Sequence, residues 1–184
     1  RCGGGTAVAS ADAISAAGLN FAVTIDLRQG GFSRHGNATV DGVEAQTAVA
    51  YNVVIENATG GTKNDTIYGN DAANILTGGG GSDKLFGFGG DDTYYITGGT
   101  ISEGANGGFD IVYSTVSHAL SANVENLFLT GAGNINGTGN ANANVLTGNS
   151  SANTLSGVAG NDTYDGAAGN DTLTDNSTTS NDIY

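Results

Sequence analysis

The chain of 184 residues contains no proline, methionine or tryptophan, and its only cysteine is Cys2. A single cysteine excludes a disulfide within the chain. The absence of proline beside 32 glycines excludes a collagen-like chain and a proline-rich linker. No apolar run approaches the roughly 18 residues that a membrane-spanning helix needs, so we expect no membrane span.

Basic residues are also scarce: the chain has five lysines and arginines and 18 acidic residues, for a net charge of −13. Such a chain repels nucleic acid and anionic lipid, and we expect neither as a partner. Multivalent cations are the natural partners. Because charged residues make up only 12% of the chain, the negative charge is concentrated at a few places, which suits binding sites.

The first part of the chain is read from its hydrophobic periodicity. Residues 1–20 form either a short helix from Ala7 to Ala17 or a flexible lead-in. Apolar residues alternate with polar ones from Phe21 to Leu27 and again from Ala45 to Ile55, which predicts two half-buried strands. The polar residues 32–42 between them are predicted to form a loop.

Two blocks of nine-residue repeats follow. In the first block (60–68, 69–77, 78–86 and 87–95), the sixth residues are Asp65, Asn74, Asp83 and Asp92, and the eighth are Ile67, Leu76, Leu85 and Tyr94. In the second block (139–147, 148–156, 157–165 and 166–174), the sixth residues are Asn144, Asn153, Asp162 and Asp171, and the eighth are Leu146, Leu155, Tyr164 and Leu173. A fixed period of this kind indicates a solenoid.

These patterns divide the chain into four expected regions. They are an N-terminal lead-in (1–20), a first roll with its N-terminal strands (21–95), connecting strands and a loop (96–123), and a second roll (124–184). The sequence 181–184 starts another repeat, so we expect the second roll to be truncated and the parent protein to be longer.

A nine-residue unit fits one short strand and one glycine-rich turn. A three-residue strand sends only its middle side chain inward, and two units complete a coil of about 18 residues with a strand on each side. Stacked coils place Asp65 and Asp83 one coil apart, where like charges repel. A cation bound by carboxylates and turn carbonyls relieves this repulsion, and such oxygen ligands suit Ca²⁺. Folding is therefore expected to depend on metal binding.

One unit, Gly78 to Phe86, matches the complete GGxGxDxUx nonapeptide of RTX (repeats-in-toxin) proteins. Residues 21–95 also resemble the C-terminal domain of serralysin-type secreted metalloproteases, and 124–174 resemble RTX repeats in general. The resemblance implies an all-β fold, a right-handed parallel β-roll (a β-helix or solenoid), with two nonapeptide-repeat blocks joined by strands. It also implies several bound Ca²⁺ ions.

The resemblance implies that each ion lies between turns one coil apart, which supply carbonyls and the sixth-position side chains. By position, the first site would use Gly61, Lys63 and Asp65 with Gly78, Gly80 and Asp83, and the second Asn70, Ala72 and Asn74 with Gly87, Gly89 and Asp92. The third would use Asn140, Asn142 and Asn144 with Gly157, Ala159 and Asp162, and the fourth Asn149, Ser151 and Asn153 with Gly166, Ala168 and Asp171.

Asparagine replaces aspartate at Asn74, Asn144 and Asn153. An amide oxygen can bind Ca²⁺ but brings no charge, so the site of Asp65 and Asp83 is expected to be the tightest and the two sites of the second block weak or empty. Lys63 is tolerable at a carbonyl position only if its side chain points to solvent.

No enzyme motif accompanies the repeats. The sequence has no HExxH, no G-x-S-x-G and no P-loop, so we expect no catalytic activity in this chain. The resemblance implies a calcium-binding module of a secreted protein that passes a type I exporter unfolded and folds outside the cell. The alternatives are a calcium-stabilised subunit of a surface layer, filament or adhesin, as a homo-oligomer or surface polymer, and an accessory module of a polysaccharide-modifying enzyme.

Overall fold

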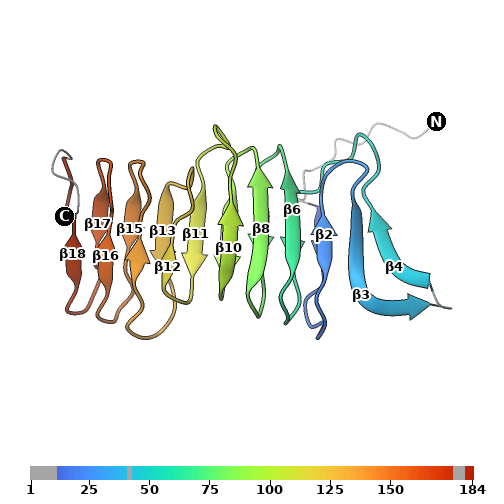
Figure 1. The fold of residues 1–184 in the computed structure, drawn as a ribbon, viewed down its shortest axis with the longest axis horizontal. Coiled ribbons are helices and arrows are strands. Elements are labelled where there is room, and N and C mark those ends of the chain that lie inside the picture. Colours follow the sequence, from blue (N-terminus) through green and yellow to red (C-terminus); the bar gives the residue numbers. More distant parts are fainter. Residues whose placement is uncertain (1–11, 41–42, 176–180) are drawn as a thin grey trace, which may run out of the picture.

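The nine-residue period of the sequence becomes the strand spacing of a parallel solenoid (Figure 1). The computed structural model describes residues 12–40, 43–175 and 181–184. Within these residues there is no helix, and none therefore that could cross a bilayer. The predicted all-β parallel β-roll is confirmed.

Three sheets make up the solenoid. The first sheet contains, in order, β1 (Ala13–Ser15), β5 (Asn57–Thr59), β7 (Ile75–Thr77), β9 (Thr93–Ile96), β11 (Ile111–Ser114), β13 (Asn126–Leu129), β15 (Val145–Thr147) and β17 (Thr163–Asp165). The second contains β10 (Gly99–Ser102), β8 (Asp83–Phe88), β6 (Thr66–Asn70), β2 (Thr24–Asp26), β3 (Phe32–Val40) and β4 (Val43–Ala48). The third contains β12 (His118–Ala119), β14 (Gly137–Thr138), β16 (Thr154–Ser156) and β18 (Thr172–Thr174).

Each short strand of the repeats contributes one inward-facing side chain to the core. Ile67 of β6 pairs with Leu85 of β8, and Leu76 of β7 pairs with Tyr94 of β9, all at 1% exposure or less. Leu146, Leu155 and Tyr164 are buried in the same way in the second block, while Leu173 is partly buried. The inward direction predicted for the eighth residue of each repeat is therefore confirmed.

The first sheet is continuous through residues 96–123. Thr93 of β9 pairs with Ile111 of β11, and Ile111 pairs in turn with Asn126 of β13. Counting in nines beyond residue 95 places Asp110 at a sixth position and Val112 at an eighth, and Val112 is fully buried. The glycine-rich loop before Asp110 conceals this register in the sequence.

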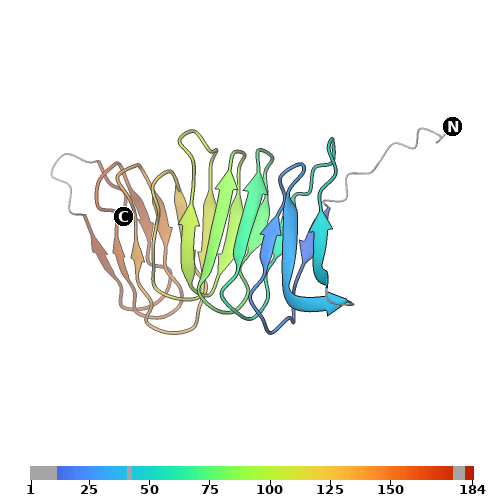
Figure 2. The same ribbon diagram turned by 45° about the vertical axis from the view of Figure 1, so that its right-hand side comes forward.

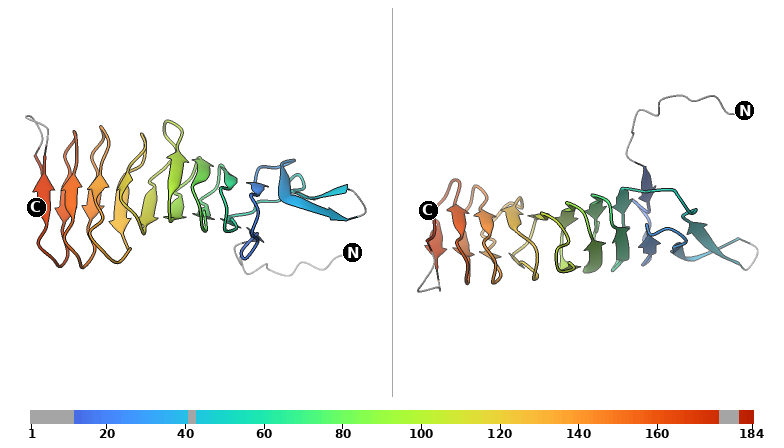
Figure 3. Two further views of the ribbon diagram at one scale, coloured as in Figure 1. Left: turned by 60° about the horizontal axis from the view of Figure 1, so that its bottom comes forward. Right: turned by 90° about the horizontal axis from the view of Figure 1, so that it is seen from above.

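Three sequence predictions for the N-terminal part were wrong. A short helix was one of two alternatives for residues 1–20, but the described part of that segment, from residue 12 onward, contains strand β1. The rest of the segment, and Cys2, lie outside the described residues. The predicted loop 32–42 contains β3 instead, which pairs antiparallel with β4. The strand expected over 45–55 ends at Ala48. The β3–β4 hairpin stands at the end of the solenoid (Figures 2 and 3), where backbone pairing holds β3, whose sequence shows no apolar alternation.

Candidate calcium sites

Sixth-position side chains link successive coils through one hydrogen bond. The backbone N–H of Asp65 donates to Asp83 Oδ1 across one coil at 2.9 Å. The same bond joins Asn74 to Asp92, Asp92 to Asp110, Asn144 to Asp162, and Asn153 to Asp171, at 2.7–2.9 Å. Each carboxylate therefore has one oxygen fixed by the neighbouring coil.

The second carboxylate oxygen has no partner in several coils. Oδ2 is buried without a hydrogen bond in Asp83, Asp92, Asp110 and Asp162, whose side chains are at most 1% exposed. Burial raises the pKa of Asp83 and Asp162, and raises that of Asp92 to about 7. A buried, unpaired carboxylate is costly, and a bound hard cation removes that cost. These aspartates therefore fit Ca²⁺.

The first predicted site is brought together. Asp65 Oδ2 accepts from Gly61 N–H at 2.6 Å, and Gly61 O accepts from Gly80 N–H at 3.0 Å. A Cβ added to Gly60 would lie within 3.0 Å of both Gly78 O and Asp65 Oδ2, so these two oxygens converge on a space that only glycine leaves open. The side chain of Lys63 is exposed, as its position requires.

The second predicted site is also brought together. Asn74 is joined to Asp92, and Gly89 N–H lies 3.5 Å from Asn70 O. Asn74 Oδ1 accepts from Asn70 N–H at 2.8 Å, the bond that Asp65 makes to Gly61 N–H in the first site. Asn70 Oδ1 also accepts from Ala72 N–H at 2.9 Å. Asn74 thus keeps the turn geometry of an aspartate but brings no charge. Gly87 lies beside Asp92 Oδ2.

The asparagines of the third predicted site hold adjacent coils together through their amides. Asn144 Nδ2 donates to the carbonyls of Val124 and Glu125, and Asn140 Nδ2 donates to the carbonyls of Val124 and Ser121. These carbonyls belong to the preceding coil and not to the predicted third site, so the amides join the two coils without a cation.

In the fourth predicted site, Asn153 Nδ2 donates to Ile135 O, and Asn149 Nδ2 donates to the carbonyls of Gly131 and Gly133. The remaining members of the third and fourth sites also lie in the turns. The backbone N–H groups of Asn142 and Ser151 donate to Asn140 Oδ1 and Asn149 Oδ1. Gly157 lies beside Asp162 and Gly166 beside Asp171, and Ala159 and Ala168 follow these glycines in the same turns.

Three acidic residues that the sequence prediction omitted extend the carboxylate ladder. Asp110 continues it from Asp92, and Asp110 N–H donates to Glu125 Oε2 at 2.8 Å, fifteen residues along the chain. Glu103 lies with Asp92 and Asp110 so that one carboxylate oxygen of each falls within 4.8 Å of the others. Continuing the nine-residue count would have found Asp110. The same count places Glu103 at an eighth position, but in the structure Ile101 pairs with Leu85 instead, and Glu103 follows β10.

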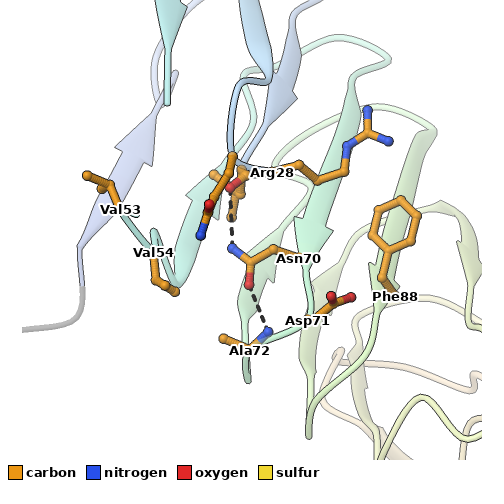
Figure 4. Close-up of a pocket in the computed structure, with 9 residues that line it drawn as sticks. Arg28, Val53, Val54, Asn70, Asp71, Ala72 and Phe88 are labelled. Carbon is orange, nitrogen blue, oxygen red and sulfur yellow. Dashed lines mark hydrogen bonds between the residues drawn. The ribbon is translucent and has the colours of Figure 1, made fainter. Parts of the chain in front are cut away.

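A separate pocket of about 610 Å³ lies beside β6 (Figure 4). Its wall includes Arg28, whose guanidinium lies 4.8 Å from the Tyr68 ring and 5.4 Å from the Phe88 ring and is paired with Asp26 at 2.6 Å. Asn70 also lines it, with its amide bonded to Leu27 O and Ile55 O. The side chains of Arg28 and Asn70 at this pocket are thus already paired.

The repeat geometry agrees with known proteins. A model of four RTX calcium-binding nonapeptide repeats matches residues 55–85, 68–100 and 138–173. These segments are RTX calcium-binding nonapeptide repeats. They include all four predicted sites, but Asp110 and Glu103 lie outside them. Serralysin from Proteus mirabilis is 52% identical to this chain over 52 residues, which are 28% of the chain and 10% of the relative. The chain therefore covers only about a tenth of that relative's length.

Proposed function

We propose that this chain is a non-catalytic calcium-binding module of a secreted protein and that it completes its folding when Ca²⁺ enters the turns. The observation that supports this most directly is the set of buried aspartate oxygens without partners. In the absence of a cation these groups oppose folding, because burial penalises their charged form. With Ca²⁺ bound, the same groups hold adjacent coils together.

The secretion route follows from the same dependence. A chain that does not complete its coils at low Ca²⁺ stays unfolded enough to pass a type I exporter, and it folds outside where Ca²⁺ is abundant. The match to serralysin over one segment supports this extracellular location.

The test is a Ca²⁺ titration followed by far-UV circular dichroism, with Asp83→Ala compared with the wild type. Asp71→Ala, in a turn but not at a sixth position, is the matched control. We expect sheet signal to rise with Ca²⁺ in the wild type and control, and to require a higher concentration in Asp83→Ala. A full sheet signal in chelator would refute calcium-dependent folding.

A further inference from the structure

We propose that Asp92, Glu103 and Asp110 form an additional calcium site that is built differently from the sites between repeat turns. The proposal rests on the calcium-binding function proposed above. It differs from the predicted second site because Glu103 and Asp110 belong to neither of that site's turns and lie outside the segments that match the RTX repeat.

The geometry suits a single ion. Two oxygens bound to one Ca²⁺ at 2.3–2.6 Å lie at most about 5 Å apart. The three carboxylates meet this condition, with one oxygen of each within 4.8 Å of the others. Asp92 and Asp110 are 1% and 0% exposed, and their Oδ2 atoms, like Glu103 Oε2, are buried without a hydrogen-bond partner.

The surrounding contacts hold these oxygens in place. Asp110 Oδ1 accepts from the backbone N–H of Asp92 at 2.8 Å, so the two aspartates are fixed to each other. The hydroxyl of Tyr94 donates to Glu103 Oε1. A Cβ on Gly87 would lie within 3.0 Å of oxygens of Asp92, Tyr94 and Glu103, which shows that these atoms surround a small space beside the glycine.

Among the described residues, no basic side chain contributes to the charge of this cluster. Burial raises the pKa of Glu103 to about 8 and that of Asp110 to about 6, and the charges that act on them belong to other acidic groups. The three carboxylates therefore repel one another when no cation is bound. A divalent cation bound by all three groups offsets this repulsion.

The second block offers an internal comparison. Tyr164 occupies the position of Tyr94 seventy residues later, and Asp162 that of Asp92. Because Leu85 pairs with Ile101 and Leu155 pairs with Leu173, the residue equivalent to Glu103 is Asp175. The Tyr94 hydroxyl donates to the carboxylate of Glu103, whereas the Tyr164 hydroxyl donates to the carbonyl of Thr174, at 3.2 Å.

Glu103→Gln tests the site because it removes one charged ligand and leaves every predicted repeat site intact. Bound Ca²⁺ is counted by native mass spectrometry, affinity is measured by calorimetry, and the midpoint of thermal unfolding is measured in chelator and in Ca²⁺. Glu56→Gln, a glutamate outside the cluster, is the matched control. We expect Glu103→Gln to bind one ion fewer or to bind it more than about 100-fold more weakly.

The two unfolding conditions should give opposite results. In chelator Glu103→Gln removes repulsion and should unfold at a higher temperature than the wild type, whereas its stabilisation by Ca²⁺ should be smaller. An unchanged ion count and affinity would overturn the proposal and leave shared protons as the explanation of the cluster. Loss of Ca²⁺ binding in the wild type itself would instead refute the calcium-binding function.

If Glu103→Gln does not fold, Glu103→Asp keeps the charge and withdraws the carboxylate by one methylene. We then expect one ion to bind at least about 10-fold more weakly, and unchanged binding would again overturn the proposal. Mg²⁺ and Mn²⁺ serve as additional probes, and tighter binding of either than of Ca²⁺ would overturn the assignment to calcium.

Discussion

The backbone N–H of Asn144 donates to Asp162 Oδ1 at 2.8 Å, while the amide of Asn144 bonds to two carbonyls of the preceding coil. The asparagine thus joins three successive coils by hydrogen bonds, without a cation. Asn144→Asp replaces these donors by a second carboxylate one coil from Asp162. We expect a Ca²⁺ ion to bind between the two residues, so that the variant is less stable than the wild type in chelator and binds one ion more in Ca²⁺.

Native mass spectrometry and thermal unfolding in both conditions check this prediction. Asn142→Asp is the matched control because its side chain is exposed in the same turn. An equal ion count in Asn144→Asp and the wild type would contradict the account of Asn144 as a substitute for the cation.

Two glycines of the first site should respond differently to the same substitution. A Cβ on Gly60 would collide with the Gly78 carbonyl and with Asp65, whereas a Cβ on Gly80 meets nothing closer than 3.5 Å. Gly60→Ala is therefore expected to raise the Ca²⁺ concentration needed for folding, and Gly80→Ala to leave it nearly unchanged. Circular dichroism titrations of the two variants measure this difference, and equal midpoints would show that the space beside Gly60 does not matter.

The inner and outer faces of β7 provide a test of the core. Leu76 is fully buried, and the preceding residue, Ile75, is 46% exposed. We expect Leu76→Ala to lower the free energy of unfolding in Ca²⁺ by about 2–5 kcal/mol, since it leaves a cavity. Ile75→Ala should cost about 1 kcal/mol or less. Chemical denaturation measures both, and equal losses would argue against a one-residue-thick core.

His118 is expected to make the protein less stable in mild acid. Burial lowers its pKa in the folded state, and its Nε2 is buried without a hydrogen-bond partner. The unfolded chain therefore binds a proton more readily, so stability is complete above the ordinary histidine pKa of about 6.5 and falls as pH decreases below it.

Thermal unfolding of the wild type and His118→Gln in saturating Ca²⁺, between about pH 5 and 8, isolates this contribution because the carboxylates are common to both proteins. Below about pH 6.5, the midpoint of thermal unfolding should fall more steeply with decreasing pH in the wild type than in His118→Gln. Parallel pH profiles would rule out this role for the histidine.

The repeats could be predicted from the sequence because position in the repeat fixes direction in the solenoid. Asp65 and Asp83 lie together, and Leu85 lies in the core, since any coil of two nonapeptides places them there. Glu103 could not be predicted in this way. The nine-residue period places it at an inward eighth position, whereas β10 is shifted by two residues, so that Ile101 pairs with Leu85 and Glu103 lies beyond the strand, beside Asp92.

The N-terminal hairpin shows a second limit. β3 pairs with β4 through backbone groups that every residue except proline carries, so its residues show no distinctive pattern. The antiparallel pairing is set by its place at the end of the second sheet, which is tertiary information.

The alternation of asparagine and aspartate along the axis also has a kinetic consequence. In a solenoid each coil contacts only its neighbours, so folding can begin in one part and spread. The amides of Asn144 and Asn153 bond to the preceding coils, whereas Asp83, Asp92, Asp110 and Asp162 each keep a buried carboxylate oxygen without a partner. Only Asp162 of these four lies in the second block. We therefore expect the C-terminal coils to form at a lower Ca²⁺ concentration, and a rising concentration to extend the solenoid, through the continuous first sheet, toward the N-terminal end.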